Sequence, residues 1–229
     1  MNLISDNKSN SGTRDTGVSP VNHGLKACFR RGTYLPHWEI EGGVYFVTFR
    51  LADSLPRYIV RSLKAQRKDV IKTIKKSDKT PTSVENKSIN KLFSRKFDRY
   101  LDSGRGACHL KNPEIAEMVA NALCHFDGNR YFLFAWSVMP NHVHVVVRPE
   151  SGYNLSDILH SWKSFTAKRA NKILKRGGRF WQPEYYDHLI RDEKDLKRCI
   201  EYTYYNPEKA GMDKWRWRGC ISNINNGLG

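Results

Sequence analysis

One segment constrains this chain more than any other, the run MPNHVHVVV from Met139 to Val147. Its β-branched residues favour a strand, and successive side chains of a strand point to opposite faces of a sheet. His142 and His144 therefore project from one face, and the alternate valines from the other, where they can be buried. A strand of this kind presents two imidazole nitrogens to a single metal ion.

The charge of the chain points to an anionic partner. Its 229 residues, 39% apolar and 12% aromatic, are enough for a hydrophobic core, but the formal net charge is +16. The positive side chains repel one another in a compact fold, so an anionic partner is expected. Nucleic acid is the leading candidate, and an anionic membrane surface is the main alternative. No apolar run approaches the roughly 18 residues that span a membrane. The N-terminus lacks the apolar stretch of a signal peptide, so we expect a cytoplasmic protein with no membrane partner.

The cysteines indicate reduced thiols rather than a disulfide scaffold. The chain has five of them, an odd number, and none are in CxxC spacing: Cys28, Cys108, Cys124, Cys199 and Cys220. Neither paired disulfides nor a structural zinc site is expected.

Composition divides the chain into a tail, a domain and a second tail. Residues 1–24 are polar, without apolar periodicity, and are predicted to be flexible. Residues 25–212 are predicted to form one domain, interrupted by a polar, proline-containing insertion at about 77–90. Residues 213–229 are assigned to a C-terminal tail.

Hydrophobic periodicity predicts strands alternating with helices. Strands are expected at 43–51, with a central position, and at 131–138, the latter paired as a hairpin with the histidine strand. Tyr185 to Ile190 is predicted to be a short strand or extended edge. Helices are expected at 57–76, from Pro113 to near His125 with Asn112 as cap, at 155–174, and from Glu193 to Asn206 before Pro207, with a short amphipathic segment at 92–101. This order predicts an α+β fold, a broadly ferredoxin-like antiparallel sheet covered by helices.

The long helix at 155–174 and its C-terminal end form the clearest basic surface. No acidic residue occurs between Ile158 and Arg179. Any one of these cations could simply lie on a solvent-exposed helix face. On a chain of this charge, however, the group as a whole indicates binding of DNA phosphates. The candidate DNA-binding residues are Lys163, Lys168, Arg169, Lys172, Lys175 and Arg176.

The last helix offers partners for the histidine pair. Its core stripe is predicted to be four-spaced, through Leu196, Ile200 and Tyr204, and Tyr202 lies about 200° around the helix from Ile200, pointing away from the core. Asn206 is four residues further along the same face, and its amide oxygen suits Mg²⁺ or Mn²⁺. Residue types alone also allow a helix cap at Asn206 and simple packing of the tyrosines.

Four blocks of the chain together resemble REP-associated tyrosine transposases, single-tyrosine members of the HUH single-strand DNA nuclease superfamily. These blocks are PNHVHVVV, HSWKSFTAKRAN, FWQPEYYDHLIRDEKD and EYTYYNPEKAG. The likeness continues upstream through GGVYFVTFRL and FDRYLDSGRGACHLKNPEIAEMVANAL, and covers about residues 32–212.

This resemblance implies a fold, a chemistry and a substrate. The fold would be an HUH-type nuclease fold with the histidine pair on a central strand. His142, His144 and Asn206 would be ligands of Mg²⁺ or Mn²⁺, and Tyr202 would be the nucleophile. The protein would cut and rejoin single-stranded DNA at repetitive extragenic palindromes folded as hairpins, through a 5′-phosphotyrosine. It would be a bacterial, nucleoid-associated transposase, a monomer or homodimer, with no small-molecule cofactor.

Two other readings fit parts of the sequence. A nucleotide hydrolase of the histidine-triad type also places alternating histidines on a strand, but it needs a third histidine where this chain has Val146. A non-catalytic nucleic-acid-binding module on a ferredoxin-like sheet would use the basic helices and leave the histidines incidental.

Overall fold

The computed structural model of the protein describes residues 27–31, 36–56 and 99–221, with scattered positions between 58 and 96. The predicted tail at 1–24 and the predicted insertion at 77–90 lie outside the described residues. Of the basic helix predicted at 57–76, the described positions between 58 and 72 are helical. No helix in the part of the chain described is both long and apolar enough to cross a membrane.

A five-stranded antiparallel sheet forms the centre of the fold, in the spatial order β6-β3-β5-β4-β7. Its strands are β3 (Val44–Arg50), β4 (Tyr131–Val138), β5 (His142–Pro149), β6 (Tyr186–Ile190) and β7 (Arg218–Cys220). Helix α3 (Pro113–Cys124) connects β3 to β4, and α4 (Leu155–Ile173) connects β5 to β6. The succession of β3 to β6 is the ferredoxin-like order, so the predicted α+β class is confirmed.

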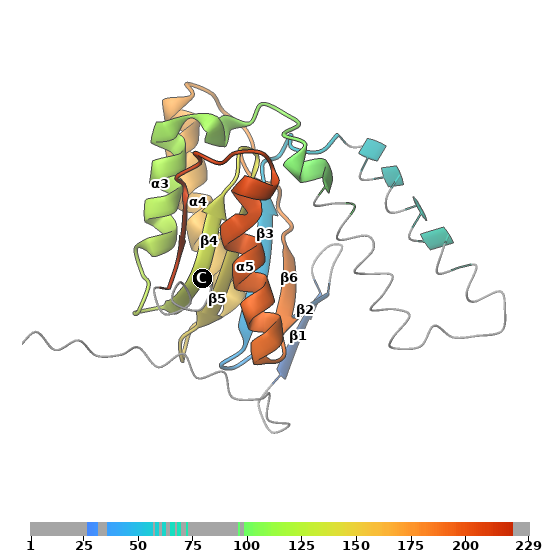
Figure 1. The fold of residues 1–229 in the computed structure, drawn as a ribbon, viewed down its shortest axis with the longest axis vertical. Coiled ribbons are helices and arrows are strands. Elements are labelled where there is room, and N and C mark those ends of the chain that lie inside the picture. The colour runs from blue at the N-terminus through green and yellow to red at the C-terminus, as the bar shows by residue number, and fades with distance from the viewer. Residues whose placement is uncertain are drawn as a thin grey trace, which may run out of the picture.

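Helices cover both faces of this sheet (Figure 1). Helices α3 and α4 bury their apolar stripes on one face, against Val143, Val145 and Val147 of β5. Helix α5 (Glu193–Lys209) packs on the opposite face, against Phe46 and Val146 among others. The two sides of β5 therefore belong to two separate cores, as the alternation of its sequence predicts.

The β4–β5 hairpin carries an irregularity that reverses the facing of the β4 residues after it. The pairing register shifts between Leu133 and Ala135, where a β-bulge adds a residue to β4. Beyond the bulge Ser137 lies directly opposite His144, and Thr48 of β3 lies opposite His144 on its other side. Because opposed residues share a face, all three side chains point toward α5.

Two parts of the architecture differ from the sequence-based expectations. A two-stranded sheet of β1 (Ala27–Arg31) and β2 (Pro36–Ile40) precedes β3 and was not predicted. The segment assigned to a C-terminal tail contains β7, which pairs with β4. Gly219 permits this pairing, since a Cβ there would lie 2.7 Å from the indole nitrogen of Trp136. Three-residue strands carry too little alternation to be recognised from sequence.

The start of α3 follows the predicted chemistry, but the end of α5 does not. The Asn112 side chain accepts a hydrogen bond from the Glu114 backbone N–H, which caps α3 as expected. Helix α5 was expected to stop before Pro207, yet it continues to Lys209 with that proline inside it. Pro207 is buried within this helix, where it removes one backbone N–H donor.

Candidate active site

The imidazoles of His142 and His144 face each other beneath α5. Both residues have 0% exposure, and their Nε2 atoms lie 3.0 Å apart. Two ligands about 2.1 Å from one ion, at the right angle of an octahedron, stand about 3.0 Å apart. The pair is therefore already spaced as neighbouring ligands of one divalent cation.

The tautomer of His142 follows from its neighbour in the sequence. The Asn141 side-chain nitrogen donates to the backbone carbonyls of Leu101, at 3.1 Å, and Arg105, at 2.9 Å. Its oxygen must then accept, and it lies 2.7 Å from His142 Nδ1. The proton of His142 is thus on Nδ1, and the lone pair of Nε2 is directed at the site.

His144 is oriented by a hydroxyl in the same way. Thr48 Oγ1 lies 2.8 Å from His144 Nδ1 and can accept a hydrogen bond from its N–H. Burial lowers the pKa of His144 to about 3, and burial together with the nearby His144 lowers the pKa of His142 well below its ordinary value. Both rings are consequently neutral at physiological pH, as metal ligands must be.

A carboxylate that sequence reasoning missed lies beside the pair. Asp102 Oδ1 is 3.7 Å from His142 Nε2, and this oxygen is buried with no hydrogen-bond partner, although the side chain as a whole is 31% exposed. Burial raises the pKa of Asp102 to about 6. An aspartate in the glycine-containing segment LDSGRG is typical of an ordinary turn, so the local sequence does not identify Asp102 as a site residue.

Helix α5 brings Tyr202 to the histidines. Its ring centroid is 5.3 Å from that of His144 and 5.6 Å from that of Phe46. The expectation that Tyr202 points away from the core is therefore wrong, because its ring packs against the hydrophobic cluster between α5 and the sheet. A strict four-residue spacing drifts by about 40° per step around a helix. The stripe instead alternates threes and fours, which buries Thr203 and leaves Tyr204 half-exposed.

Asn206 is buried inside the helix and does not cap it. It lies inside α5 with 1% exposure, and its side-chain oxygen is buried without a hydrogen-bond partner. The hydroxyls of Thr203, one turn earlier, and of Ser137, opposite His144, are likewise buried and unpartnered. Buried acceptors without donors are costly, and a bound cation satisfies such oxygens. The imidazole nitrogens and buried side-chain oxygens on this face therefore fit a hard divalent ion as ligands.

An arginine lies on the same face of the sheet as the pair. Arg50 of β3 pairs in register with His142, so its side chain shares the histidine face. Its guanidinium donates to Ser54 Oγ at 3.1 Å. Burial lowers the Arg50 pKa to about 10, which still leaves it charged at neutral pH. The sequence alone does not single out this residue, because one arginine at the end of a strand carries no distinguishing pattern.

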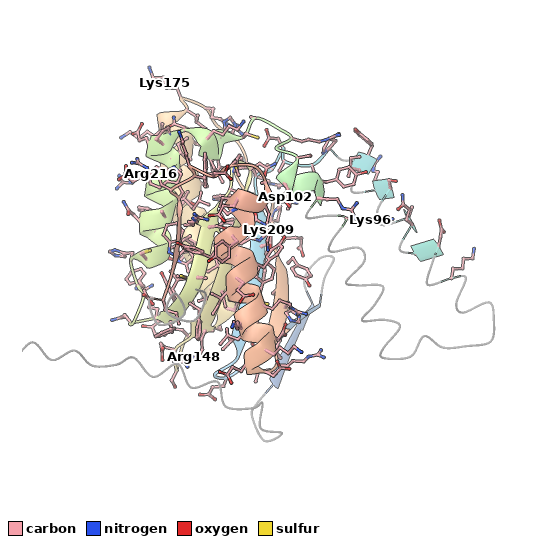
Figure 2. The ribbon with its side chains drawn as sticks, viewed as in Figure 1. Lys96, Asp102, Arg148, Lys175, Lys209 and Arg216 are labelled. Carbon is pink, nitrogen blue, oxygen red and sulfur yellow. The ribbon has the colours of Figure 1, made fainter. Side chains whose placement is uncertain are left out.

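The structure does not bring the predicted DNA-binding residues to the histidine pair. They lie on α4 and just beyond it, on the opposite face of the sheet (Figure 1). Exposed among them are Lys168, Arg169, Lys172, Lys175 and Arg176, with Lys175 at the far end of α4 in Figure 2.

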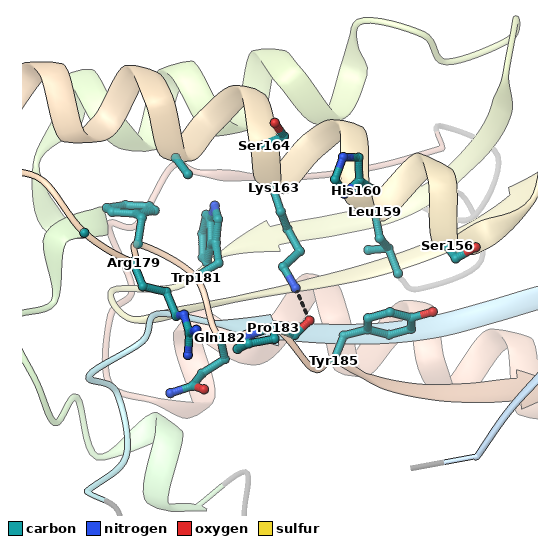
Figure 3. Close-up of a pocket in the computed structure, with 13 residues that line it drawn as sticks. Ser156, Leu159, His160, Lys163, Ser164, Arg179, Trp181, Gln182, Pro183 and Tyr185 are labelled. Atoms are coloured by element: carbon teal, nitrogen blue, oxygen red, sulfur yellow. Dashed lines mark hydrogen bonds between the residues drawn. The ribbon is translucent and has the colours of Figure 1, made fainter. Parts of the chain in front are cut away.

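Lys163 differs from the rest of this basic set. Its ammonium group donates to the Pro183 carbonyl at 2.6 Å, across a groove of about 500 Å³ between α4 and residues 178–185 (Figure 3). Burial lowers the pKa of Lys163 to about 8. Lys163 thus links α4 to the segment at 178–185 and is not part of the exposed basic surface.

Fold and site together define a ferredoxin-like α+β protein with a candidate divalent-metal centre under a tyrosine-bearing helix. Residues 110–203 match the protein family described as Transposase IS200 like. The chain is 28% identical over 99 residues to the REP-associated tyrosine transposase of Escherichia coli (strain K12), covering 43% of this chain and 58% of that protein. A Haemophilus influenzae protein described as the same kind of transposase is 33% identical over 84 residues, covering 32% and 48%.

These matches confirm the resemblance to REP-associated tyrosine transposases. The chain spans about half the length of the curated relatives that it matches. A solved structure of a REP-associated tyrosine transposase bound to a REP hairpin is similar over 87% of this chain and 88% of that chain, with a TM-score of 0.50. At 19% sequence identity, that likeness shows a common fold.

Proposed function

We propose that this protein is a metal-dependent single-stranded DNA endonuclease and strand transferase. It acts on hairpin-forming repetitive extragenic palindromes through a covalent 5′-phosphotyrosine on Tyr202. One observation carries the proposal: two imidazole Nε2 atoms stand 3.0 Å apart, and the Tyr202 ring lies 5.3 Å from one of those imidazoles. The names of the relatives and of the hairpin-bound structure support the substrate.

The residues that would hold Mg²⁺ or Mn²⁺ are His142, His144 and Asn206. When bound, such an ion polarises the scissile phosphate and neutralises the charge that develops on its oxygens. Asn141 and Thr48 hold the two imidazoles with their Nε2 lone pairs inward, so the ligands need no rearrangement. Arg50 adds a fixed positive charge on the same face for the bound strand.

Tyr202 carries the covalent chemistry. Its phenolic oxygen forms a bond to phosphorus, the bond between phosphorus and the 3′ oxygen breaks, and that oxygen leaves as a 3′-hydroxyl after taking up a proton. The phenolic proton is released as the bond forms. A 3′-hydroxyl of another end reverses the reaction and displaces the tyrosine, which transfers the strand without ATP.

The exposed cations of α4 and of the residues just after it would bind DNA outside the reacting strand, because they lie across the sheet from Tyr202. A line of lysines and arginines neutralises successive phosphates and releases counterions. Lys168, Arg169, Lys172, Lys175 and Arg176 would therefore contribute affinity rather than chemistry, and would favour association with the nucleoid.

Trapping of the covalent intermediate tests this proposal. The probe is a hairpin oligonucleotide with single-stranded flanks, taken from inverted repeats beside the gene, incubated with the protein and Mn²⁺. We expect a denaturant-resistant protein–DNA species that Tyr202→Phe abolishes. Tyr204→Phe and Tyr205→Phe are matched controls on the same helix and should keep it, since these two rings pack edge to face against each other rather than against the histidines.

The opposite result has a definite meaning. Tight hairpin binding with no adduct in any divalent metal would overturn the proposal in favour of the non-catalytic nucleic-acid-binding module. An adduct that persists in Tyr202→Phe would exclude this tyrosine as the nucleophile.

A further inference from the structure

We propose that the Asp102 carboxylate is a further protein ligand of the metal ion, placed there by Asn141. This inference rests on the metal site of the proposed function and adds a charged oxygen to an otherwise neutral ligand set. Asp102 comes from the segment before α3, far from both β5 and α5 in the sequence.

The ligand atoms are arranged for one ion. Asp102 Oδ1 is 3.7 Å from His142 Nε2, and the ligand atoms of Asp102, His142 and His144 all lie within 4.8 Å of one another. In an octahedron with bonds of about 2.1 Å, ligand atoms stand about 3.0 Å apart when adjacent and about 4.2 Å when opposite. The observed separations agree with this geometry to within small side-chain movements.

The state of the carboxylate oxygen also points to a ligand. Asp102 Oδ1 is buried and has no hydrogen-bond donor. A buried carboxylate oxygen without a donor is costly, so its retention needs a compensating interaction. A cation between this oxygen and the two imidazole nitrogens supplies that interaction.

One side chain orders both parts of the proposed site. The Asn141 amide nitrogen binds the carbonyls of Leu101 and Arg105, which flank Asp102 in the chain, and its oxygen accepts from Nδ1 of His142. The helical turn that carries Asp102 is therefore clamped to the residue that precedes the first histidine ligand. Movement of one ligand would require breaking the hydrogen bonds that hold the other.

The Asp102 segment is anchored on either side of this clamp. Leu101 has 1% exposure and packs with Leu55 and Ile59. Gly106 has a φ of +87°, and a Cβ there would lie 2.7 Å from a backbone oxygen of Asp53, so only glycine fits this turn. The next residue, Ala107, donates its N–H to the Asp53 carboxylate at 2.8 Å.

Figure 2 is consistent with this placement. It labels Asp102 and Lys209 at the same end of the molecule, where α5 finishes. Asn206, on the last turn of α5, and His142, at the start of β5, belong to the elements that meet there. A carboxylate at this place would raise the affinity for hard ions such as Mg²⁺ and Mn²⁺, which prefer oxygen ligands.

Direct metal binding tests the inference. Electron paramagnetic resonance of free Mn²⁺ gives the Kd of the protein without DNA. We expect Asp102→Asn to weaken Mn²⁺ binding by about 10- to 100-fold, the scale of changes around metal sites. The matched control Glu117→Gln, an exposed carboxylate of α3 on the opposite face, should leave Kd unchanged.

A second variant gives a positive signal that misfolding cannot imitate. In Asp102→Cys, a thiolate replaces the carboxylate, and Co²⁺ should produce thiolate-to-cobalt charge-transfer absorption that wild-type protein lacks. Absence of that absorption in a folded, Co²⁺-binding variant would overturn the inference.

The outcomes separate this inference from the proposed function. If His142→Ala abolishes Mn²⁺ binding and Asp102→Asn does not change it, Asp102 is not a ligand, while the histidine centre and the proposed function stand. If the wild-type protein binds no divalent metal, both the inference and the metal-dependent function fail.

Discussion

Replacement of Asn141 by alanine should be among the most damaging single changes near the site. The side chain is completely buried and takes part in hydrogen bonds to Leu101, Arg105 and His142. Alanine removes them together and leaves buried carbonyls and an imidazole N–H without partners. The backbone of β5 stays intact, because its ladder does not use this side chain.

The cost can be worked out from these contacts. Loss of one hydrogen bond costs about 1 kcal/mol net. Where the loss leaves a buried group unsatisfied, the cost per bond rises to about 1–3 kcal/mol. Water entering the space offsets part of the penalty. We therefore expect a loss of about 3–5 kcal/mol in the free energy of unfolding, a large share of the roughly 5–15 kcal/mol typical of a domain.

Urea unfolding followed by circular dichroism measures this change. The control is Asn112→Ala, which removes only the solvent-exposed cap of α3 and should cost about 1 kcal/mol. The wild-type protein should also gain stability with added Mn²⁺, and Asn141→Ala should gain less, since its ligands are no longer preorganised. A loss in Asn141→Ala no larger than that of Asn112→Ala would refute the reasoning.

Three further predictions address other parts of the molecule. Ser137→Ala removes a buried, unpartnered hydroxyl, so thermal unfolding should show a stability within about 1 kcal/mol of wild type or higher, and a large loss would reveal a partner for that hydroxyl. Burial raises the pKa of Asp195, but the hydrogen bond and charge of His188 and a nearby arginine outweigh it, so the net pKa is lowered. The carboxylate therefore stabilises the fold above about pH 4, and the stability gap between wild type and Asp195→Asn, followed by urea unfolding, should close as the pH falls below that value. Replacing Lys168 and Lys172 together by glutamine should reduce the slope of log affinity against log salt by about 1–2 in hairpin-binding titrations, whereas an unchanged slope would exclude them from the interface.

The order of strands and helices could be predicted from the sequence because it rests on local periodicity. Alternation in the run from Met139 to Val147 was enough to place His142 and His144 on one face, since neighbouring side chains of a strand must diverge. The cap of α3 and the apolar stripes of α3 and α4 are equally local. The four-residue interval between Tyr202 and Asn206 kept these two residues close along α5, whatever face the helix presented.

The sequence could not reveal which face of α5 meets the sheet. Tyr202 was expected to point outward, and its contact with His144 depends on how α5 packs across β5 and β4. The same applies to the basic residues of α4, whose separation from the histidines by a whole sheet has no trace in their spacing. Strand β7 was missed because its pairing with β4 depends on the space left at Gly219 rather than on its own pattern.

By itself, then, the sequence determined the ferredoxin-like order of elements and the pairing of two histidines on one side of a strand. Only the tertiary structure decided what lies against those histidines, Tyr202 from α5 and Asp102 from the turn clamped by Asn141. It also decided that Arg50 of β3 shares their face of the sheet. The physical reason is that side-chain direction within one element is fixed by backbone periodicity. Contacts between elements depend instead on packing, bulges and buried hydrogen bonds between residues distant in the chain.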